Sequence, residues 1–282
     1  MRTVLNYHKK EGGDAMNINL FWDKLNLPRD LIFETEKLEK SFTEINNLCR
    51  LYEKDHKKFC KEILKKENSE LWFFYLYSFM ACKTYDQYIE KGISEKIFWD
   101  TFSDIKFWCE NFEKEYRKKG LGEYEWFYHH IDMKLFRLGR LQFQEMELEE
   151  DLVGNGIMIK RGTEVLNIHI PQGERLNWNK CEESIQKAEK FWGKDKVYLC
   201  HSWLLYPELA ELLGENSNIC RFAKHFKIIK TDFNEREGEW RIFGKVERVI
   251  ARYPENTILQ KKVKAYLLSG KVLGNGWGIL RK

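Results

Sequence analysis

The sequence lacks the marks of secretion, of membrane insertion and of a cysteine-built fold. No apolar run approaches the roughly 20 residues of a membrane-spanning helix, and residues 1–13 mix charges, Asn and Gly without the apolar stretch of a secretory signal. The seven cysteines are an odd number, widely spaced and free of any C-x-x-C pair, which argues against a disulfide framework and a zinc ribbon. We therefore expect a cytoplasmic protein with reduced thiols, no membrane partner and no metal.

A surplus of one charge is also missing. The chain has 48 basic and 44 acidic residues, closely interleaved, as in Lys54-Asp55-His56-Lys57-Lys58. Such interleaving is typical of solvated helix faces with i,i+4 pairs and not of a phosphate-binding stripe. We therefore expect no nucleic-acid partner. Internal repeats and low-complexity segments are absent as well.

What the sequence has in abundance is large apolar side chains, with 43% hydrophobic and 15% aromatic residues. This composition is globular, and a length of 282 residues favours two domains. From about Leu27 to Arg137, apolar residues recur every three or four positions, which predicts helices throughout. Gly92 is placed to end one helix and Ser94 to cap the next, which runs to about residue 118. We interpret the aromatics as packing seams, with a ligand-binding box inside the bundle as the alternative.

After a last helical piece around residues 123–135, the pattern changes to β. Alternating residues at 141–146 predict a long strand starting near Leu138, and residues 157–160 and 165–170 flank a predicted hairpin turn at 161–164. The remaining expected elements are a helix at 181–192, a strand at 196–201, a short helix at 207–213, a helix opened by Asn216 or Ser217 with Asn218 as a cap, a strand at 226–231, a helix at 257–268, and a glycine-rich close at 270–278 that we interpret as a helix cap and a tight turn. This order predicts an α+β protein and is compatible with several folds.

Five segments of the second half, taken together, resemble the predicted N-acyltransferases that join a helical N-terminal domain to a GNAT-like C-terminal domain. The segments are Phe136-Arg137-Leu138-Gly139-Arg140-Leu141-Gln142-Phe143, His169-Ile170-Pro171-Gln172-Gly173, Cys200-His201-Ser202-Trp203-Leu204-Leu205-Tyr206-Pro207, Asn216-Ser217-Asn218-Ile219, and the tail from Pro254 to Gly278 with Gly274-Asn275-Gly276-Trp277-Gly278. The resemblance implies an all-helical domain at 1–134, followed by a GNAT-like mixed-sheet domain at 135–282.

The resemblance further implies that two central parallel strands splay apart and hold acyl-CoA or acetyl-CoA, as co-substrate, in the gap. The two strands here would be residues 165–170 and 196–202. The pantetheine would run along the first strand toward Ile170. The pyrophosphate would meet the loop 171–179, where backbone N–H groups and the dipole of the following helix favour an anion.

In that loop, the resemblance assigns cofactor contacts to Gln172, Gly173 and Arg175. The loop lacks the second small residue of the usual Q/R-x-x-G-x-G/A pattern, and it carries Glu174, whose charge Arg175 can offset.

Amide formation from a thioester needs a base for the amine, donors for the carbonyl and a proton for the departing thiolate. On strand 165–170, Asn167 and His169 share one face, so His169 is a candidate base; an ordinary hydrogen-bonded or surface histidine is the alternative. Ser202 and Tyr206 can supply the proton for the thiolate, although Ser202 equally suits a helix cap. Cys200 and His201 point to opposite faces of their strand, so we discount a cysteine nucleophile.

Substrate contacts are expected on the acceptor side of the gap. Arg140 and Gln142 alternate on the strand that borders this side in the GNAT-like fold, and with Asn167 they form the predicted substrate-binding set. A partly exposed strand without a function would show the same polar alternation.

The leading hypothesis is therefore transfer of an acyl group from acyl-CoA to the amine of a small-molecule or peptide acceptor. The incomplete pyrophosphate loop keeps an alternative open, namely a non-catalytic GNAT-like protein that binds a ligand or partner. The sequence specifies neither the acceptor, nor the acyl length, nor the oligomeric state.

Overall fold

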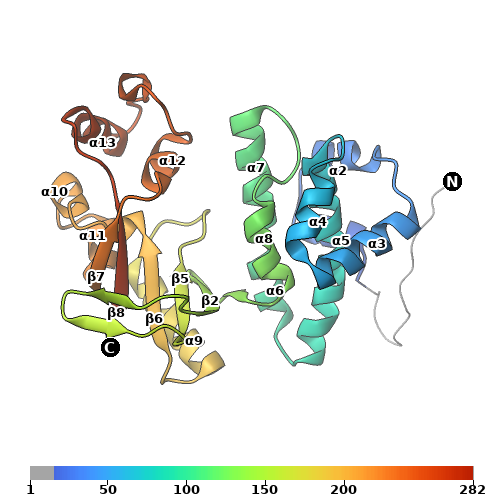
Figure 1. The fold of residues 1–282 in the computed structure, drawn as a ribbon, viewed down its shortest axis with the longest axis horizontal. Coiled ribbons are helices and arrows are strands. Elements are labelled where there is room, and N and C mark those ends of the chain that lie inside the picture. Colours follow the sequence, from blue (N-terminus) through green and yellow to red (C-terminus); the bar gives the residue numbers. More distant parts are fainter. Residues whose placement is uncertain (1–15, 282) are drawn as a thin grey trace. The chain divides into compact units, whose positions relative to one another are not determined.

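The computed structural model describes residues 16–281. The chain forms two compact units, Met1–Arg137 and Leu138–Lys282, coloured blue to green and yellow-green to red in Figure 1. Residues 1–13, for which we predicted the absence of a secretory signal, lie outside the described residues. Within the described range, no helix is long and apolar enough to cross a membrane.

The described part of the first unit is helical, as predicted, up to residue 131. Its elements are α1 (Ile18–Lys24), α2 (Arg29–Glu36), α3 (Phe42–Lys54), α4 (His56–Ile63), α5 (Ser69–Glu90), α6 (Glu95–Phe102), α7 (Asp104–Tyr116), α8 (Tyr124–Ile131) and the short strand β1 (Leu135–Arg137). Helix α5 is buried on all sides from Leu71 to Ala81, which is the pattern of a central helix. The aromatic rings pack on one another, as the stacked pair Phe73 and Tyr124 shows with ring centroids 4.0 Å apart.

Two predictions for this unit are wrong. The helix predicted from Ser94 to about residue 118 is two helices, and the segment 135–137 is a strand. The break falls at Ser103, whose Oγ donates to the carbonyl oxygen of Asp100 at 2.6 Å. Beside it, the buried carboxylate of Asp104 lies 3.2 Å from Nε2 of His130. Such contacts redirect a chain whose apolar periodicity continues unbroken.

The second unit has the predicted α+β composition with a mixed sheet. Its elements are β2 (Gln142–Glu147), β3 (Leu152–Gly154), β4 (Ile157–Ile159), β5 (Glu164–His169), α9 (Trp178–Trp192), β6 (Val197–Ser202), the 3-10 helix η1 (Trp203–Leu205), α10 (Leu209–Leu213), α11 (Asn218–Ala223), β7 (Phe226–Asp232), α12 (Glu237–Phe243), η2 (Ile250–Arg252), α13 (Ile258–Leu268) and β8 (Asn275–Leu280). Within this unit the strand order is β2-β5-β6-β8-β7. β5 and β6 are parallel, and the other neighbouring pairs are antiparallel.

The hairpin predicted around residues 161–164 is wrong in its pairing. β4 pairs with β3 across the two-residue turn Asn155-Gly156, and β5 pairs with β2 instead. The Asn-Gly dipeptide is the strongest short hairpin signal, so the local turn determines the partner of β4. The segment between β2 and β5 that contains this hairpin is closed at its base by a backbone hydrogen bond of 3.1 Å from the N–H of Leu148 to the carbonyl oxygen of Thr163.

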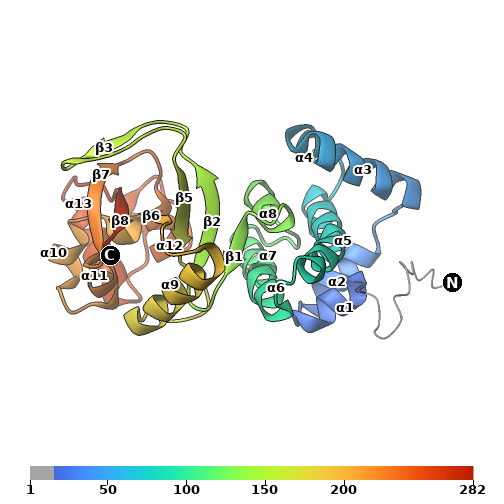
Figure 2. The same cartoon turned by 90° about the horizontal axis from the view of Figure 1, so that it is seen from below.

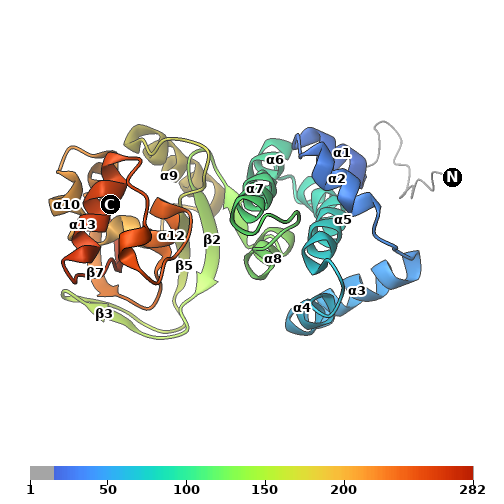
Figure 3. The same ribbon diagram turned by 90° about the horizontal axis from the view of Figure 1, so that it is seen from above.

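The β3–β4 hairpin and helix α9 cover opposite faces of the sheet, as Figures 2 and 3 both show. On the hairpin face, Leu152 and Ile159 pack with Val165 and Leu199 in one apolar cluster. On the other face, Phe143 contacts Trp192 of α9, with ring centroids 6.0 Å apart. The hairpin face is the one that bears the polar residues described below.

The glycine-rich close at 270–278 begins as the predicted helix cap, because Gly270 follows the end of α13 with a φ of +83° and donates to the carbonyl oxygen of Leu267 at 3.0 Å. The predicted tight turn is wrong, because residues 275–280 form β8 in the interior of the sheet. Gly276 is required there: a Cβ atom would lie 2.3 Å from the carbonyl oxygen of Leu205 in η1. Periodicity also gave no prediction for α12. Finally, Ser217 and not Asn218 caps α11, since its Oγ accepts from the N–H of Cys220 at 3.2 Å.

Candidate functional site

The two parallel strands of the sheet separate toward their carboxyl ends, as the resemblance implied. β5 and β6 are paired from Val165 and Val197 to Asn167 and Leu199. Beyond that point, β5 continues along β2 up to His169, whereas β6 continues along β8 up to Ser202. The divergence therefore begins directly after Asn167 and leaves His169 on one side and residues 200–202 on the other.

A row of polar side chains crosses the sheet at this diverging end. The strand registers place alternate residues of the neighbouring strands on one face, which is the face that the β3–β4 hairpin covers farther down. The polar members of this face at the diverging end are Gln142, Gln144, Asn167, His169, His201, Lys230, Asp232 and Asn275, and the indole N–H of Trp277 lies among them. The sequence analysis predicted three of them as site residues, and the strand pairing adds the rest.

His169 lies among amide side chains. Its Nε2 is 2.9 Å from Oε1 of Gln144 and 3.2 Å from Nδ2 of Asn167. Oε1 of Gln144 only accepts and Nδ2 of Asn167 only donates, so Nε2 of His169 donates to Gln144 in one tautomer and accepts from Asn167 in the other. Oδ1 of Asn167 is buried and has no hydrogen-bond partner among the described residues. The predicted base role of His169 stays a prediction.

A second histidine on the same face has a carboxylate partner. Nε2 of His201 is 2.8 Å from Oδ2 of Asp232, and the side chains are 26% and 16% exposed. The indole Nε1 of Trp277 donates to the same oxygen at 3.1 Å, and its ring stacks on the imidazole with centroids 4.2 Å apart. Histidine, carboxylate and indole thus form one rigid cluster on β6, β7 and β8, at the edge of the divergence.

Sequence analysis missed this cluster for two reasons. It considered His201 only as a partner of Cys200, which points to the other face, and it interpreted the segment of Trp277 as a turn. The available signal was Asp232, which directly follows the predicted strand at 226–231, because strand ends often present polar groups to a ligand. The burial of Cys200 is complete and raises the pKa of its thiol, which keeps it protonated and unreactive.

Ser202 and Tyr206, the predicted proton donors, follow β6. Oγ of Ser202 accepts from the N–H of Leu204 at 3.2 Å and caps η1, which is the structural alternative that we left open. The hydroxyl of Tyr206 is 3.1 Å from that of Tyr266, which in turn donates to Oε2 of Glu208 at 2.5 Å. The proton-donor roles of Ser202 and Tyr206 stay predictions.

Tyr206, Tyr266 and Glu208 line a pocket of about 370 Å³. Its other lining residues are Phe233, Lys271 and Val272. Burial raises the pKa of Tyr206 and of Tyr266, and the hydrogen bond from Tyr266 lowers the pKa of Glu208. At neutral pH the phenols are therefore protonated and the carboxylate is charged.

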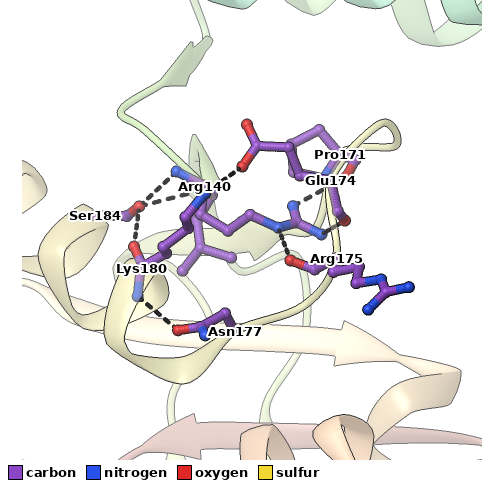
Figure 4. Close-up of polar contacts among 8 residues, drawn as sticks. Arg140, Pro171, Glu174, Arg175, Asn177, Lys180 and Ser184 are labelled. Atoms are coloured by element: carbon purple, nitrogen blue, oxygen red, sulfur yellow. Dashed lines mark hydrogen bonds and ion pairs between the residues drawn. The ribbon is translucent and has the colours of Figure 1, made fainter.

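The loop after β5 is tied to Arg140, as Figure 4 shows. The guanidinium donates from Nη1 to the carbonyl oxygen of Pro171 at 3.0 Å, from Nη2 to that of Glu174 at 2.9 Å and from Nε to that of Arg175 at 3.2 Å. Its side chain is 5% exposed. The structure thus gives Arg140 contacts with the predicted cofactor loop, whereas we expected it to contact the acceptor; acceptor binding by Arg140 stays a prediction.

Local hydrogen bonds hold both ends of this arrangement. Oγ of Ser184, on α9, accepts from the N–H of Arg140 at 2.8 Å. Asn177 caps α9 by accepting from the N–H of Lys180, whose Nζ lies 3.1 Å from Oε2 of Glu174. Lys180, and not Arg175, therefore offsets the charge of Glu174. Among the described residues, no group of His, Cys, Asp and Glu is arranged to hold a metal ion.

A mixed sheet whose central parallel strands diverge, with a helix opening directly after the first of them, defines the second unit as a GNAT-like domain. Comparison with known families agrees: residues 16–133 match the N-acyltransferase N-terminal domain, and residues 135–280 match the GNAT-like C-terminal domain. The chain belongs to the family built from these two domains. No curated protein matches it.

Several solved structures share the fold. One is an acyltransferase in complex with decanoyl-CoA and teicoplanin, which has a TM-score of 0.75 and 20% identity, covering 97% of this chain and 89% of that chain. Another is an acyltransferase in complex with CoA and 10C-teicoplanin, with a TM-score of 0.74 and 20% identity over 96% of this chain and 88% of that chain. A mutant acyltransferase in complex with octanoyl-CoA has a TM-score of 0.75 and 20% identity, covering 94% and 87%.

Proposed function

We propose that this chain is an N-acyltransferase, which transfers an acyl group from acyl-CoA to the amine of a small-molecule or peptide acceptor. The observation that carries the proposal is the divergence of β5 and β6, with the carboxylate-paired His201 beside it. Membership of the family and the acyl-CoA held by structural relatives support it. We further propose that the helical domain spans 1–134, that the GNAT-like domain spans 135–282, and that the protein acts in the cytoplasm.

The residues present fit the co-substrate. The pantetheine would lie along β5 as an extra extended chain, past Ile170. Its pyrophosphate would meet the loop with Gln172, Gly173 and Arg175. Gly173 has a φ of +105°, a conformation that favours glycine and lets the backbone approach a ligand. The N-terminus of α9, which has 15 residues, adds a favourable dipole for the anion.

In this proposal His201 is the base. The amine nitrogen attacks the thioester carbonyl carbon, the C–S bond breaks, and the amine proton passes to Nδ1 of His201. Asp232 stabilises the resulting imidazolium through Nε2, a support that the amide partners of His169 do not give. Trp277 fixes the ring plane by stacking.

The remaining site residues take supporting roles. The hydroxyl of Ser202 or Tyr206 supplies the proton for the departing thiolate and is reprotonated from solvent, to which His201 releases the amine proton. Gln142, Asn167 and His169 line the acceptor side of the divergence. A relative that holds both decanoyl-CoA and teicoplanin supports a search that starts with medium-chain acyl-CoA and bulky amine acceptors.

The test is calorimetric titration with CoA and decanoyl-CoA, followed by thiol-release assays with an amine panel. We expect CoA binding, and thiol release that depends on the amine. Binding without release for every amine would favour the non-catalytic alternative, and no binding of either ligand would reject the proposal. At about a hundred times its Kd, CoA should also stabilise the fold by roughly 2.7 kcal/mol.

A further inference from the structure

The guanidinium of Arg140 binds three backbone carbonyl oxygens of the loop 171–175. It reaches the carbonyl oxygens of Pro171, Glu174 and Arg175 from β2's leading turn, 31 to 35 residues earlier in the chain. With 5% of its surface exposed, Arg140 does not present its charge to bulk solvent.

This contact determines where the loop's N–H groups point. In a planar trans peptide, the carbonyl oxygen and the N–H of the same unit point in opposite directions. Because the oxygens of Glu174 and Arg175 face Arg140, the N–H groups of Arg175 and Leu176 are directed to the opposite side. Directly after them begins the first turn of α9, where N–H groups lack partners within the helix.

The same contact compensates for the missing small residue of the loop. In the usual pattern, a second glycine or alanine lets the backbone turn its N–H groups toward the pyrophosphate. Here Leu176 and Asn177 occupy the end of the loop, and a cation fixes the peptide orientation from behind. Its positive charge, together with Lys180 against Glu174, also makes the loop more favourable for an anion.

We propose that Arg140 is a positioning residue for the pyrophosphate of CoA: it binds the carbonyl oxygens of loop 171–175 and thereby directs the loop's N–H groups toward the phosphates. The inference rests on the proposed function, because it names the part of the acyl-CoA site that this side chain organises. It extends that function by separating Arg140, which acts through the loop, from the residues that touch the substrate.

The test compares two donors in the variants Arg140→Met and Arg140→Lys. Acyl-CoA carries the pyrophosphate, and the matched acyl-pantetheine lacks it. For Arg140→Met we expect Kd for CoA, measured by calorimetry, and KM for acyl-CoA to rise about 10- to 100-fold, since two or more charge-assisted contacts are lost. KM and kcat for acyl-pantetheine should stay within twofold. Arg140→Lys keeps the positive charge but lacks the planar guanidinium with its several N–H donors. Its Kd for CoA and its KM for acyl-CoA should therefore lie between those of wild type and of Arg140→Met.

The control is Arg236→Lys, which alters a second arginine with several hydrogen bonds: Arg236, at the N-cap of α12, is exposed and pairs with the buried carboxylate of Glu239. It should leave the ratio of the two KM values unchanged. Equal losses for both donors in the Arg140 variants, or unchanged CoA binding, would overturn the inference. If Arg140→Met fails to fold, Arg140→Lys decides alone by the same ratio. Wild-type protein that binds no CoA would instead reject the proposed function.

Discussion

The imidazole of His201 and the indole of Trp277 lie almost parallel, at 14°, with ring centroids 4.2 Å apart, and their nitrogens bond the same oxygen of Asp232. Three strands contribute one residue each, so the geometry depends on β8 lying between β6 and β7. Such an arrangement fixes the imidazole in both position and tautomer, which is what a general base requires.

Removal of the carboxylate should therefore impair catalysis without affecting CoA binding. For Asp232→Asn we expect kcat to fall by about 10- to 100-fold, because the imidazolium loses its carboxylate partner. For His201→Gln we expect a fall of about 10²- to 10⁴-fold, because the base itself is absent. The measurement is steady-state acyl transfer over a range of pH, alongside the Kd of CoA. His169→Gln serves as the comparison; a larger loss there than in His201→Gln would make His169 the base.

Tyr206 should matter through its hydroxyl if it protonates the thiolate. We expect Tyr206→Phe to lower kcat by about tenfold or more, with an unchanged Kd for CoA. Tyr266→Phe is a matched control, because it removes the neighbouring hydroxyl of the same network and leaves Tyr206 in place. Equal activities of the two variants and wild type would assign Tyr206 to packing alone.

The approach of η1 to β8 should make Gly276 the more sensitive of two neighbouring glycines. A Cβ at Gly276 would meet the backbone oxygen of Leu205 at 2.3 Å, whereas one at Gly278 would meet the end of the Leu205 side chain at 2.8 Å. The end of a side chain can move aside more easily than the backbone of η1, so Gly276→Ala should cost about 2–4 kcal/mol and Gly278→Ala less. Chemical denaturation measures both, and the reverse order would contradict the close approach.

Burial of His129 should give the stability a dependence on acid. Burial lowers the pKa of His129 from 6.5 to about 4. Between pH 6.5 and 4, His129 binds a proton in the unfolded chain but not in the folded chain. The contribution of neutral His129 to the free energy of unfolding is therefore fully present above pH 6.5 and is lost as the pH falls toward 4. The slope reaches at most about 1.4 kcal/mol per pH unit. Denaturation of wild type and His129→Gln at pH 4.5 to 7 checks this, and equal slopes would count against it.

Much of the chain could be predicted from the sequence by itself. The 3.6-residue spacing of apolar side chains, the stop at Gly92 and the cap at Ser94 place helices, and alternation places β2. These are properties of residues close in sequence, so a linear pattern contains them. The five segments that carry the family resemblance identified the diverging pair β5 and β6 for the same reason, because each segment is contiguous.

Only the tertiary structure decided which strands are neighbours, and with them the chemistry of the site. Asp232 reaches His201 because β8 lies between their strands. β8 starts at Asn275, 43 residues after the last residue of β7, Asp232, and no local periodicity encodes that insertion. Arg140 was likewise predicted from its strand position to bind the acceptor, and only the fold brought the carbonyl groups of loop 171–175 to its guanidinium. The sequence determined the elements, and long-range backbone pairing, which links residues far apart in the chain, determined the site.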